Sequence, residues 1–172
     1  MRKKLIFLLA SSSILIFTFC NSSSSDVKSI ADAITALENE YGADPGNARA
    51  KIDPLLAKYE EYVAHPEGDE KTKVDYLLRA GEMAALINQY GKALGYYEQI
   101  LNEYPNSGKV ATALFMKGYT LDDKLKKLDE AKVIYEEFLQ KYPEDEFADD
   151  TKFLLDNLGK SEEEIIKQFE SQ

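Results

Sequence analysis

The sequence contains few of the side chains that commonly carry chemistry. Its 172 residues include one cysteine, one histidine and no tryptophan. A single cysteine excludes an intramolecular disulfide framework and a thiolate zinc site. His65 has no second histidine near it, and no segment carries a nucleophile motif or a glycine-rich phosphate loop. We therefore expect no enzymatic activity, no metal site and no cofactor.

Positive charge is also scarce. The chain has 21 Lys and Arg against 31 Asp and Glu, a formal net charge of −10. Nucleic-acid-binding proteins need a basic surface to neutralise phosphates, so nucleic acid is excluded as a partner. The acid runs at residues 144–146 and 149–150 lack the residue order of a calcium loop. Acids in the first turn of a helix are explained by the helix dipole.

The first twenty residues differ from the rest. Arg2, Lys3 and Lys4 precede an apolar stretch over Leu5 to Phe19, the layout of a bacterial secretory signal. Fifteen helical residues would span about 22 Å, short of the roughly 30 Å hydrocarbon core of a membrane. We predict a signal sequence over residues 1–20, followed by a flexible serine-rich tether over 21–26.

Cys20, the only cysteine, ends this stretch. Its position resembles that of the acylated cysteine of bacterial lipoproteins, which implies a lipid anchor at Cys20. Such signals usually carry a small residue before the cysteine, where this chain has Phe19. Two alternatives therefore stay open, namely cleavage within the serine run to give a free periplasmic protein, and an uncleaved N-terminal anchor.

A motif recurs along the chain at a constant spacing. The segment Tyr97 to Pro105 is repeated as Tyr135 to Pro143. A weaker copy, Tyr59 to Pro66, lies upstream. Tyr59 and Tyr97 are as far apart in the sequence as Tyr97 and Tyr135. We call this distance the repeat interval. Three copies at one interval indicate a protein built from structural repeats.

Each repeat is predicted to be a helical hairpin. Apolar residues at helical spacing place two hairpins over residues 70–105 and 107–143. Gly91 is expected to end the first helix of one hairpin, and Asp129 to cap the second helix of the other. The second helices are expected to end before Pro105 and Pro143, because proline disfavours helical geometry in the preceding residue.

These hairpins resemble tetratricopeptide repeats. That family places a small residue on the first helix, an alanine on the second, an aromatic residue four positions later and a terminal proline. The matching residues are Gly81, Ala93, Tyr97 and Pro105 in one hairpin and Gly118, Ala131, Tyr135 and Pro143 in the next, where the turn holds one extra residue. The resemblance implies an all-α solenoid in which the small residues let the helices approach and the tyrosines fill the space opposite. The family's tryptophan is missing, and the repeat interval is longer than the family's usual period of about 34 residues.

The flanking segments are predicted to be helical too. Residues 27–66 form a divergent hairpin, with helices near 27–41 and 47–64, a loop at Gly42 to Gly46, and Pro54 starting or kinking the second helix. Residues 146–172 form a half repeat followed by a last helix that opens with a Ser161 to Glu164 capping box. We expect that last helix to cap the stack.

The resemblance also implies a binding surface. In the family, the first helix of each hairpin faces a concave groove, which here would hold Asp75, Leu78, Arg79 and Glu82, and then Thr112, Phe115, Met116, Tyr119 and Asp122. Phe115, Met116 and Tyr119 form an apolar strip with acids nearby, suited to a partner segment with some basic residues. The alternative is that Phe115 and Met116 are core between adjacent repeats.

The expected function is that of a non-enzymatic adaptor. The long-period repeats resemble those of the lipoprotein of the outer-membrane barrel-assembly machinery and of the Tol–Pal division coordinator. The resemblance implies a periplasm-facing lipoprotein, at the outer rather than the inner membrane, that binds another envelope protein in outer-membrane protein assembly or envelope maintenance. Two alternatives are a self-assembling structural subunit, favoured if the Phe153 to Leu158 face is exposed, and a small-ligand-binding protein. The oligomeric state stays open.

Overall fold

The computed structural model describes residues 23–170, so Cys20 and the expected signal lie outside the described part. Within it every regular element is a helix, which confirms the predicted all-α solenoid. The elements are α1 (Ser23–Ala43), α2 (Ala48–Ala64), α3 (Glu70–Leu86), α4 (Tyr90–Glu103), α5 (Val110–Tyr119), the π-helical turn η1 (Thr120–Lys124), α6 (Leu128–Lys141), α7 (Ala148–Asp156) and α8 (Glu162–Glu170).

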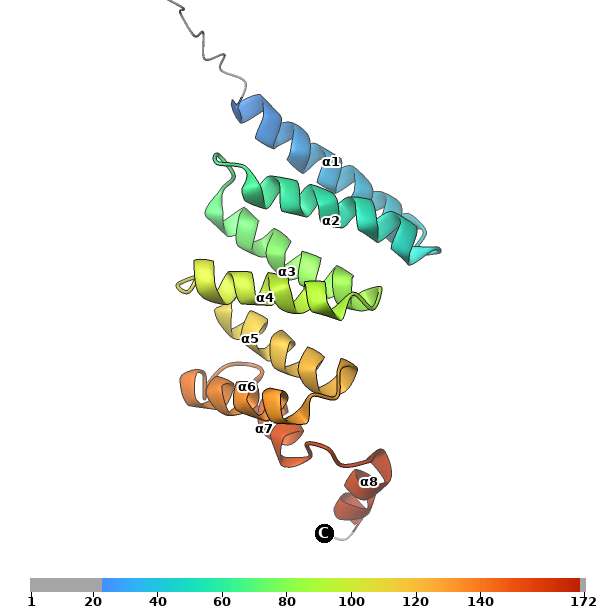
Figure 1. Ribbon diagram of the computed structural model, residues 1–172, viewed down its shortest axis with the longest axis vertical. Coiled ribbons are helices and arrows are strands. Elements are labelled where there is room, and N and C mark those ends of the chain that lie inside the picture. The colour runs from blue at the N-terminus through green and yellow to red at the C-terminus, as the bar shows by residue number, and fades with distance from the viewer. Residues whose placement is uncertain (1–22, 171–172) are drawn as a thin grey trace, which may run out of the picture.

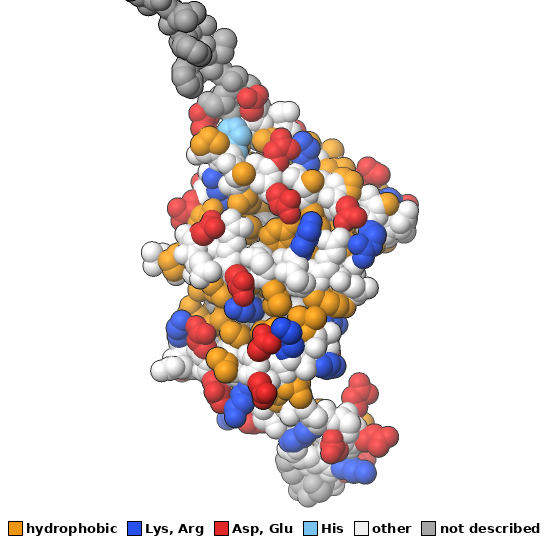
Figure 2. Space-filling view, in the orientation of Figure 1, with side chains coloured by type: hydrophobic (Ala, Val, Ile, Leu, Met, Phe, Trp, Pro, Cys, Tyr) orange, Lys and Arg blue, Asp and Glu red, His pale blue; other side chains and the backbone are white. Residues whose placement is uncertain are grey.

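The helices stack as consecutive antiparallel pairs along one axis (Figure 1). α1 packs on α2, α3 on α4 and α5 on α6, and each pair also packs on the next. The core is continuous along α1 to α5 because the buried residues of one hairpin contact those of the following hairpin. Charged side chains of both signs cover the face seen in Figure 2, with apolar side chains visible between the helices.

The N-terminal hairpin differs from its prediction at two points. Helix α1 begins at Ser23 and so takes in part of the segment expected to be a flexible tether. Ile30 and Ile34 on α1 are buried in the core, and this packing supports a helix that extends beyond them. Pro54 lies inside α2, which begins at Ala48, and therefore does not start the helix.

Two glycines allow close approach within the repeats. A β-carbon at Gly81 would lie 2.3 Å from Cε1 of Tyr97, and one at Gly118 would lie 2.8 Å from Cε1 of Tyr135. Both tyrosine rings are fully buried. Ala93 and Ala131, one helical turn before these tyrosines, are buried as well. In the α3–α4 and α5–α6 hairpins an aromatic ring is thus packed directly on a glycine of the facing helix.

The turn inside each hairpin is made by a residue in the left-handed conformation. Asn88 has φ of 61°, and Lys126, one repeat interval further along the chain, has φ of 54°. The prediction that Gly91 ends a helix is wrong, because α3 already ends at Leu86 and Gly91 is the second residue of α4. An asparagine tolerates this conformation well enough to make the turn without glycine.

The extra residue of the second hairpin is absorbed by η1. The Leu125 N–H donates to the Thr120 carbonyl at 3.1 Å, which is the wider hydrogen bond of a π-helix. The insertion therefore widens one turn of the helix and leaves α6 free to pack as α4 does. Asp129 is not the cap of α6, as had been predicted. Lys127 occupies the N-cap position, and Asp129 lies in the first turn, where its negative charge interacts favourably with the helix dipole.

The C-terminal end also departs from the prediction. The capping box of α8 is present, with the Ser161 N–H donating to Glu164 Oε2 at 2.8 Å and the Glu164 N–H to Ser161 Oγ at 3.3 Å. However, α8 buries none of its residues, so it does not cover the terminal repeat. Instead α7 ends the stack. Its residues Lys152 and Asp156 are exposed, whereas the residues one repeat interval earlier, Leu114 and Gly118, are buried. A polar outer face is what a terminal helix of a solenoid needs.

The buried hydroxyl of Tyr97 yields a stability prediction. It has no hydrogen-bond partner among the described residues. By contrast, the Tyr59 hydroxyl donates to Glu38 Oε1 at 2.6 Å. Tyr97→Phe should leave the free energy of unfolding unchanged or raise it by about 1 kcal/mol, because an unsatisfied polar group is removed. Tyr59→Phe should lower it by about 1 kcal/mol. Chemical denaturation measures both, and a loss in Tyr97→Phe equal to that in Tyr59→Phe would contradict the prediction.

None of the helices in residues 23–170 is long and apolar enough to cross a membrane.

Candidate partner-binding groove

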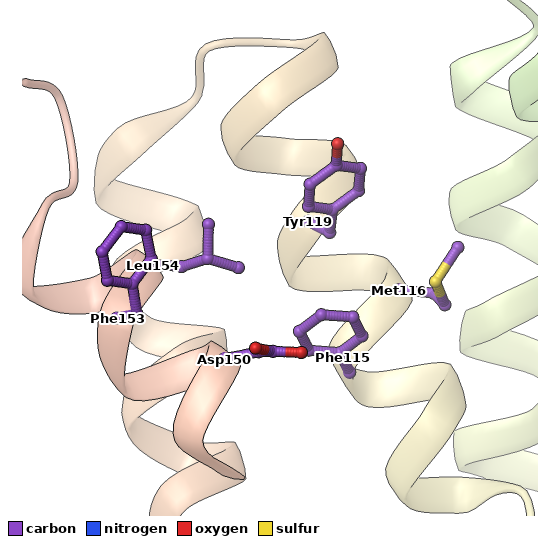
Figure 3. Close-up of a pocket in the computed structure, with 6 residues that line it drawn as sticks. All are labelled: Phe115, Met116, Tyr119, Asp150, Phe153 and Leu154. Carbon is purple, nitrogen blue, oxygen red and sulfur yellow. The ribbon is translucent and has the colours of Figure 1, made fainter. Parts of the chain in front are cut away.

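An apolar groove lies between α5 and α7. Its volume is about 310 Å³. Figure 3 shows its lining, which consists of Phe115, Met116 and Tyr119 from α5 and Asp150, Phe153 and Leu154 from α7. We call this set the apolar groove. All of its side chains are apolar or aromatic except that of Asp150, which supplies a single carboxylate.

Phe115 forms the floor of the apolar groove. Its ring stacks on that of Phe147, with the centroids 4.5 Å apart and an angle of 9° between the planes. It also meets the ring of the fully buried Phe138 edge-on at 6.1 Å. Phe115 therefore packs against the core and lines the apolar groove at the same time. Tyr119 stands beside it with the ring centroids 6.4 Å apart.

Sequence reasoning missed the α7 side of the groove as part of this surface. Phe153 and Leu154 follow Phe115 and Met116 by one repeat interval, and Asp150 follows Thr112 in the same way. The repeat therefore contained the signal, because equivalent positions of successive first helices face the same side of a solenoid. The Phe153 side chain remains 43% exposed, which keeps that wall of the groove accessible.

The residues predicted on α3 do not line the apolar groove. Leu78 is 8% exposed and belongs to the core. Arg79 forms an ion pair with Glu38 of α1, with Nη1 2.6 Å from the same Oε1 that accepts the Tyr59 hydroxyl. Asp75 lines a separate hollow beside the α4–α5 loop. Glu82 is exposed and lies outside the groove. The contribution of α3 is therefore structural, since the ion pair of Arg79 joins it to α1.

An acidic pocket of about 590 Å³ adjoins the apolar groove and shares Tyr119, Phe153 and Leu154 with it. It lies between η1, the end of α7 and the start of α8. Its charged lining residues are Asp122, Asp123, Glu162 and Glu164 together with Lys126 and Lys160. Of the predicted groove residues, Asp122 lies here and Tyr119 lines both cavities, while Thr112 lines neither.

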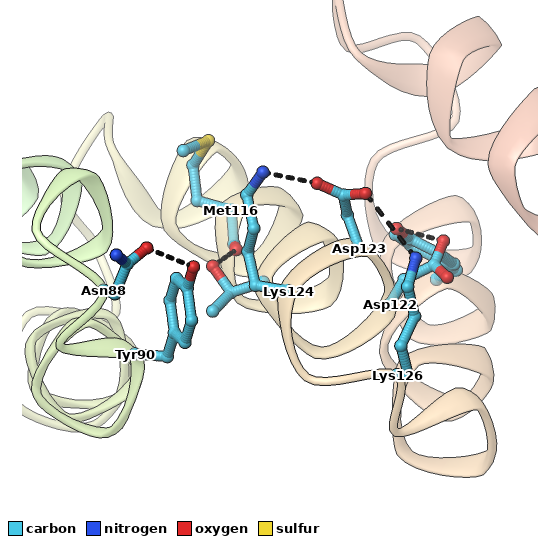
Figure 4. A network of polar contacts seen from close by, with 9 residues as sticks. Asn88, Tyr90, Met116, Asp122, Asp123, Lys124 and Lys126 are labelled. Carbon is cyan, nitrogen blue, oxygen red and sulfur yellow. Dashed lines mark hydrogen bonds and ion pairs between the residues drawn. The ribbon is translucent and has the colours of Figure 1, made fainter.

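The acids of η1 take part in a polar network (Figure 4). Asp123 forms ion pairs with Lys124 at 2.6 Å and Lys126 at 3.7 Å. The Lys124 ammonium lies 5.7 Å from the centre of the Tyr119 ring. The hydrogen bond from Lys124 lowers the pKa of Asp123, whereas burial raises the pKa of Asp122. The acceptor Asp122 Oδ2 lies 3.3 Å from the Tyr135 hydroxyl.

The raised pKa of Asp122 predicts a pH dependence. Its folded-state pKa lies above the ordinary 3.8, so the folded protein binds this proton more readily than the unfolded chain. Asp122→Asn should therefore raise stability at neutral pH, and the gain should shrink as the pH falls through the folded-state pKa and be absent below 3.8. Thermal unfolding between pH 3 and 7 tests this, and a gain that persists at the acidic end would contradict it.

Within residues 23–170, no group of three or more His, Cys, Asp or Glu side chains is arranged to hold a metal ion. The cavities described above offer apolar contact and carboxylates, which are the means of recognising a peptide or protein surface.

A stack of helical hairpins with an apolar groove on its first helices is the fold of a helical-repeat protein. The tetratricopeptide repeat family model matches this chain twice, at residues 75–107 and 112–145. Residues 75–145 thus carry two tetratricopeptide repeats, a class that generally serves as a non-enzymatic scaffold for protein–protein interactions. No curated protein and no solved structure matches the chain significantly.

Proposed function

We propose that this protein is an envelope adaptor that holds a segment of another protein in the apolar groove. The observation that carries the proposal is the groove itself, where Met116, Tyr119 and Phe153 line an open apolar hollow between the first helices of a repeat scaffold. Accessible apolar surface of this kind marks interaction sites, because water contact with it is unfavourable. Asp150 and the adjoining acidic pocket favour a partner segment that carries Lys or Arg beside its apolar residues.

The groove can be tested by crosslinking in the native envelope. A photoreactive amino acid at Met116 should crosslink one discrete protein, identified by mass spectrometry. The matched control is the same amino acid at Val133, which is 60% exposed on α6 and lies outside the groove. The crosslink from Met116 should disappear when Phe153→Ser is added. Equal crosslinking from Met116 and Val133 would contradict the groove.

We further propose that the adaptor is tethered to the membrane by lipid on Cys20. The support is the sequence alone, in which a basic start and an apolar stretch end at the only cysteine. In a cell fractionation, Cys20→Ser should move nearly all of the protein from the membrane to the soluble fraction. The intact mass of the extracted protein should correspond to a chain that starts at residue 20 and carries acyl groups. A lipid-free chain starting within residues 21–25, or a full-length chain, would overturn the anchor.

A second candidate function is self-association. It is favoured by the exposed Phe153, Ile166 and Phe169 near the C-terminal end. It is opposed by the acidic first turn of α8, residues 162–164, because two copies in contact there would repel each other. Sedimentation at increasing salt concentration decides the matter. A dimer that strengthens with salt would support self-association, and a monomer throughout would exclude it.

A further inference from the structure

Helix α8 is well formed at its start but has little packed against it. Its capping box satisfies the first backbone donors, as described above. Its apolar side chains remain in contact with solvent, with Ile166 55% and Phe169 59% exposed. A helix as short as α8 is marginal by itself, since short helices depend on tertiary packing for their stability. Within residues 23–170, most of the apolar face of α8 therefore lacks a partner surface.

This face lies beside the apolar groove. The Phe169 ring stacks on the Phe153 ring, with the centroids 6.2 Å apart, and Phe153 also lines the groove. Ile165, at the start of α8, lines the acidic pocket together with Tyr119 and Phe153. A segment bound in the groove would thus have α5 and α7 on one side and be able to contact α8 on another.

The link between α7 and α8 is short and contains a glycine and a lysine whose side chain makes polar contacts. Gly159 has φ of 77°, a conformation that glycine adopts at little cost. The Lys160 ammonium donates to Asn157 Oδ1 at 3.1 Å and to Gln168 Oε1 at 2.9 Å. Of these two bonds, only the one to Gln168 reaches from the link into α8.

We propose that α8 is a movable wall of the apolar groove, which packs Ile166 and Phe169 onto the bound partner segment. This inference rests on the proposed function. The occupant is a short segment of another protein with bulky apolar residues flanked by Lys or Arg. Bulky residues fit the groove and the α8 face, and the basic residues complement Asp150, the acidic pocket and the three glutamates at the start of α8.

Binding measurements with a defined probe test the wall. A displayed library of random short peptides is selected against the protein extracted from the membrane and kept in detergent micelles, and the enriched peptides are synthesised. They should combine aromatic or aliphatic residues with Lys or Arg, and bind more weakly as salt rises. The double variant I166S/F169S should bind them at least tenfold more weakly. The matched control L86S/V133S removes two similarly exposed apolar side chains, 54% and 60%, outside the groove and should bind normally.

A groove variant separates the failure of this inference from that of the proposed function. If Phe153→Ser abolishes binding and I166S/F169S does not change it, the groove stands and the wall is wrong. If neither variant changes binding, or no peptide is enriched, both are wrong. Acidic peptides among those selected would overturn the stated chemistry of the partner.

Hydrogen exchange gives a readout that does not depend on affinity. The backbone amides of α8 should exchange rapidly in the free protein and slow at least tenfold when a selected peptide is bound, because the closed helix is packed on its apolar face. The amides of α2, at the far end of the stack, serve as the internal control and should not change. Unchanged exchange in α8 with bound peptide would overturn the proposal.

Discussion

A leucine in place of Gly81 is expected to lower the free energy of unfolding by about 3 kcal/mol, the upper end of the usual cost of overpacking a core. The β-carbon alone would lie 2.3 Å from Cε1 of Tyr97, well inside van der Waals contact. The Tyr97 ring is fully buried and cannot move aside without shifting α4 from α3. Urea denaturation measures the loss.

Two glycine variants serve as comparison. Gly118→Leu should destabilise by a smaller amount than Gly81→Leu, because the β-carbon would lie 2.8 Å from the Tyr135 ring. Gly91→Ala meets nothing within 4 Å on α4 and should raise stability by up to about 1 kcal/mol through helix propensity. If Gly81→Leu were as stable as the wild type, the glycine–tyrosine contact would not hold the hairpin together.

Truncation of Phe138 is expected to have the largest effect of any single substitution described. Phe138→Ala should cost about 4 kcal/mol, since it removes a fully buried ring and leaves a cavity. The ring also supports the groove floor, because it contacts Phe115 edge-on at 6.1 Å and lies 5.6 Å from the Tyr142 ring. Urea denaturation measures this cost as well, and a value below about 1 kcal/mol would contradict the position of the ring in the core.

A double-mutant cycle isolates the contact between the core and the groove. Phe115→Ala and Phe138→Ala together should cost less than the sum of the single variants, with a coupling of about 1 kcal/mol for an aromatic pair. The matched pair Phe138→Ala and Val133→Ala should be additive, because Val133 is exposed on the outside of α6. Additivity in the first pair would show that the Phe115 and Phe138 rings do not stabilise each other, and loss of partner binding in Phe115→Ala could then not be ascribed to a disturbed contact with Phe138.

The repeats could be derived from the sequence because their determinants are local and periodic. Tyrosine and proline recur at the repeat interval, and the helical spacing of apolar residues marks each hairpin. The resemblance to tetratricopeptide repeats then implied the contacts of Gly81 with Tyr97 and of Gly118 with Tyr135, which the structure contains. The same periodicity relates the two walls of the groove, because Phe153 and Leu154 of α7 follow Phe115 and Met116 of α5 by one repeat interval.

Helix ends were less predictable, because several residues near a turn can take the conformation or supply the hydrogen bonds that end a helix. Asn88 takes the left-handed position at the turn that had been expected of Gly91, and Lys127 precedes α6 although Asp129 is the better capping residue. In both cases a residue other than the one with the strongest local preference occupies the position next to the helix end.

The sequence by itself determined the helical class, the repeat interval and the acidic charge, which follow from residue type and spacing, and its resemblance to tetratricopeptide repeats implied the glycine–tyrosine contacts. Only the tertiary structure decided that the inserted residue widens η1, that α7 ends the stack, and that α8 is left with its apolar face open beside Phe153. These features depend on how one helix lies against another. That arrangement is set by the sum of many weak side-chain contacts across the repeats, which no local pattern encodes.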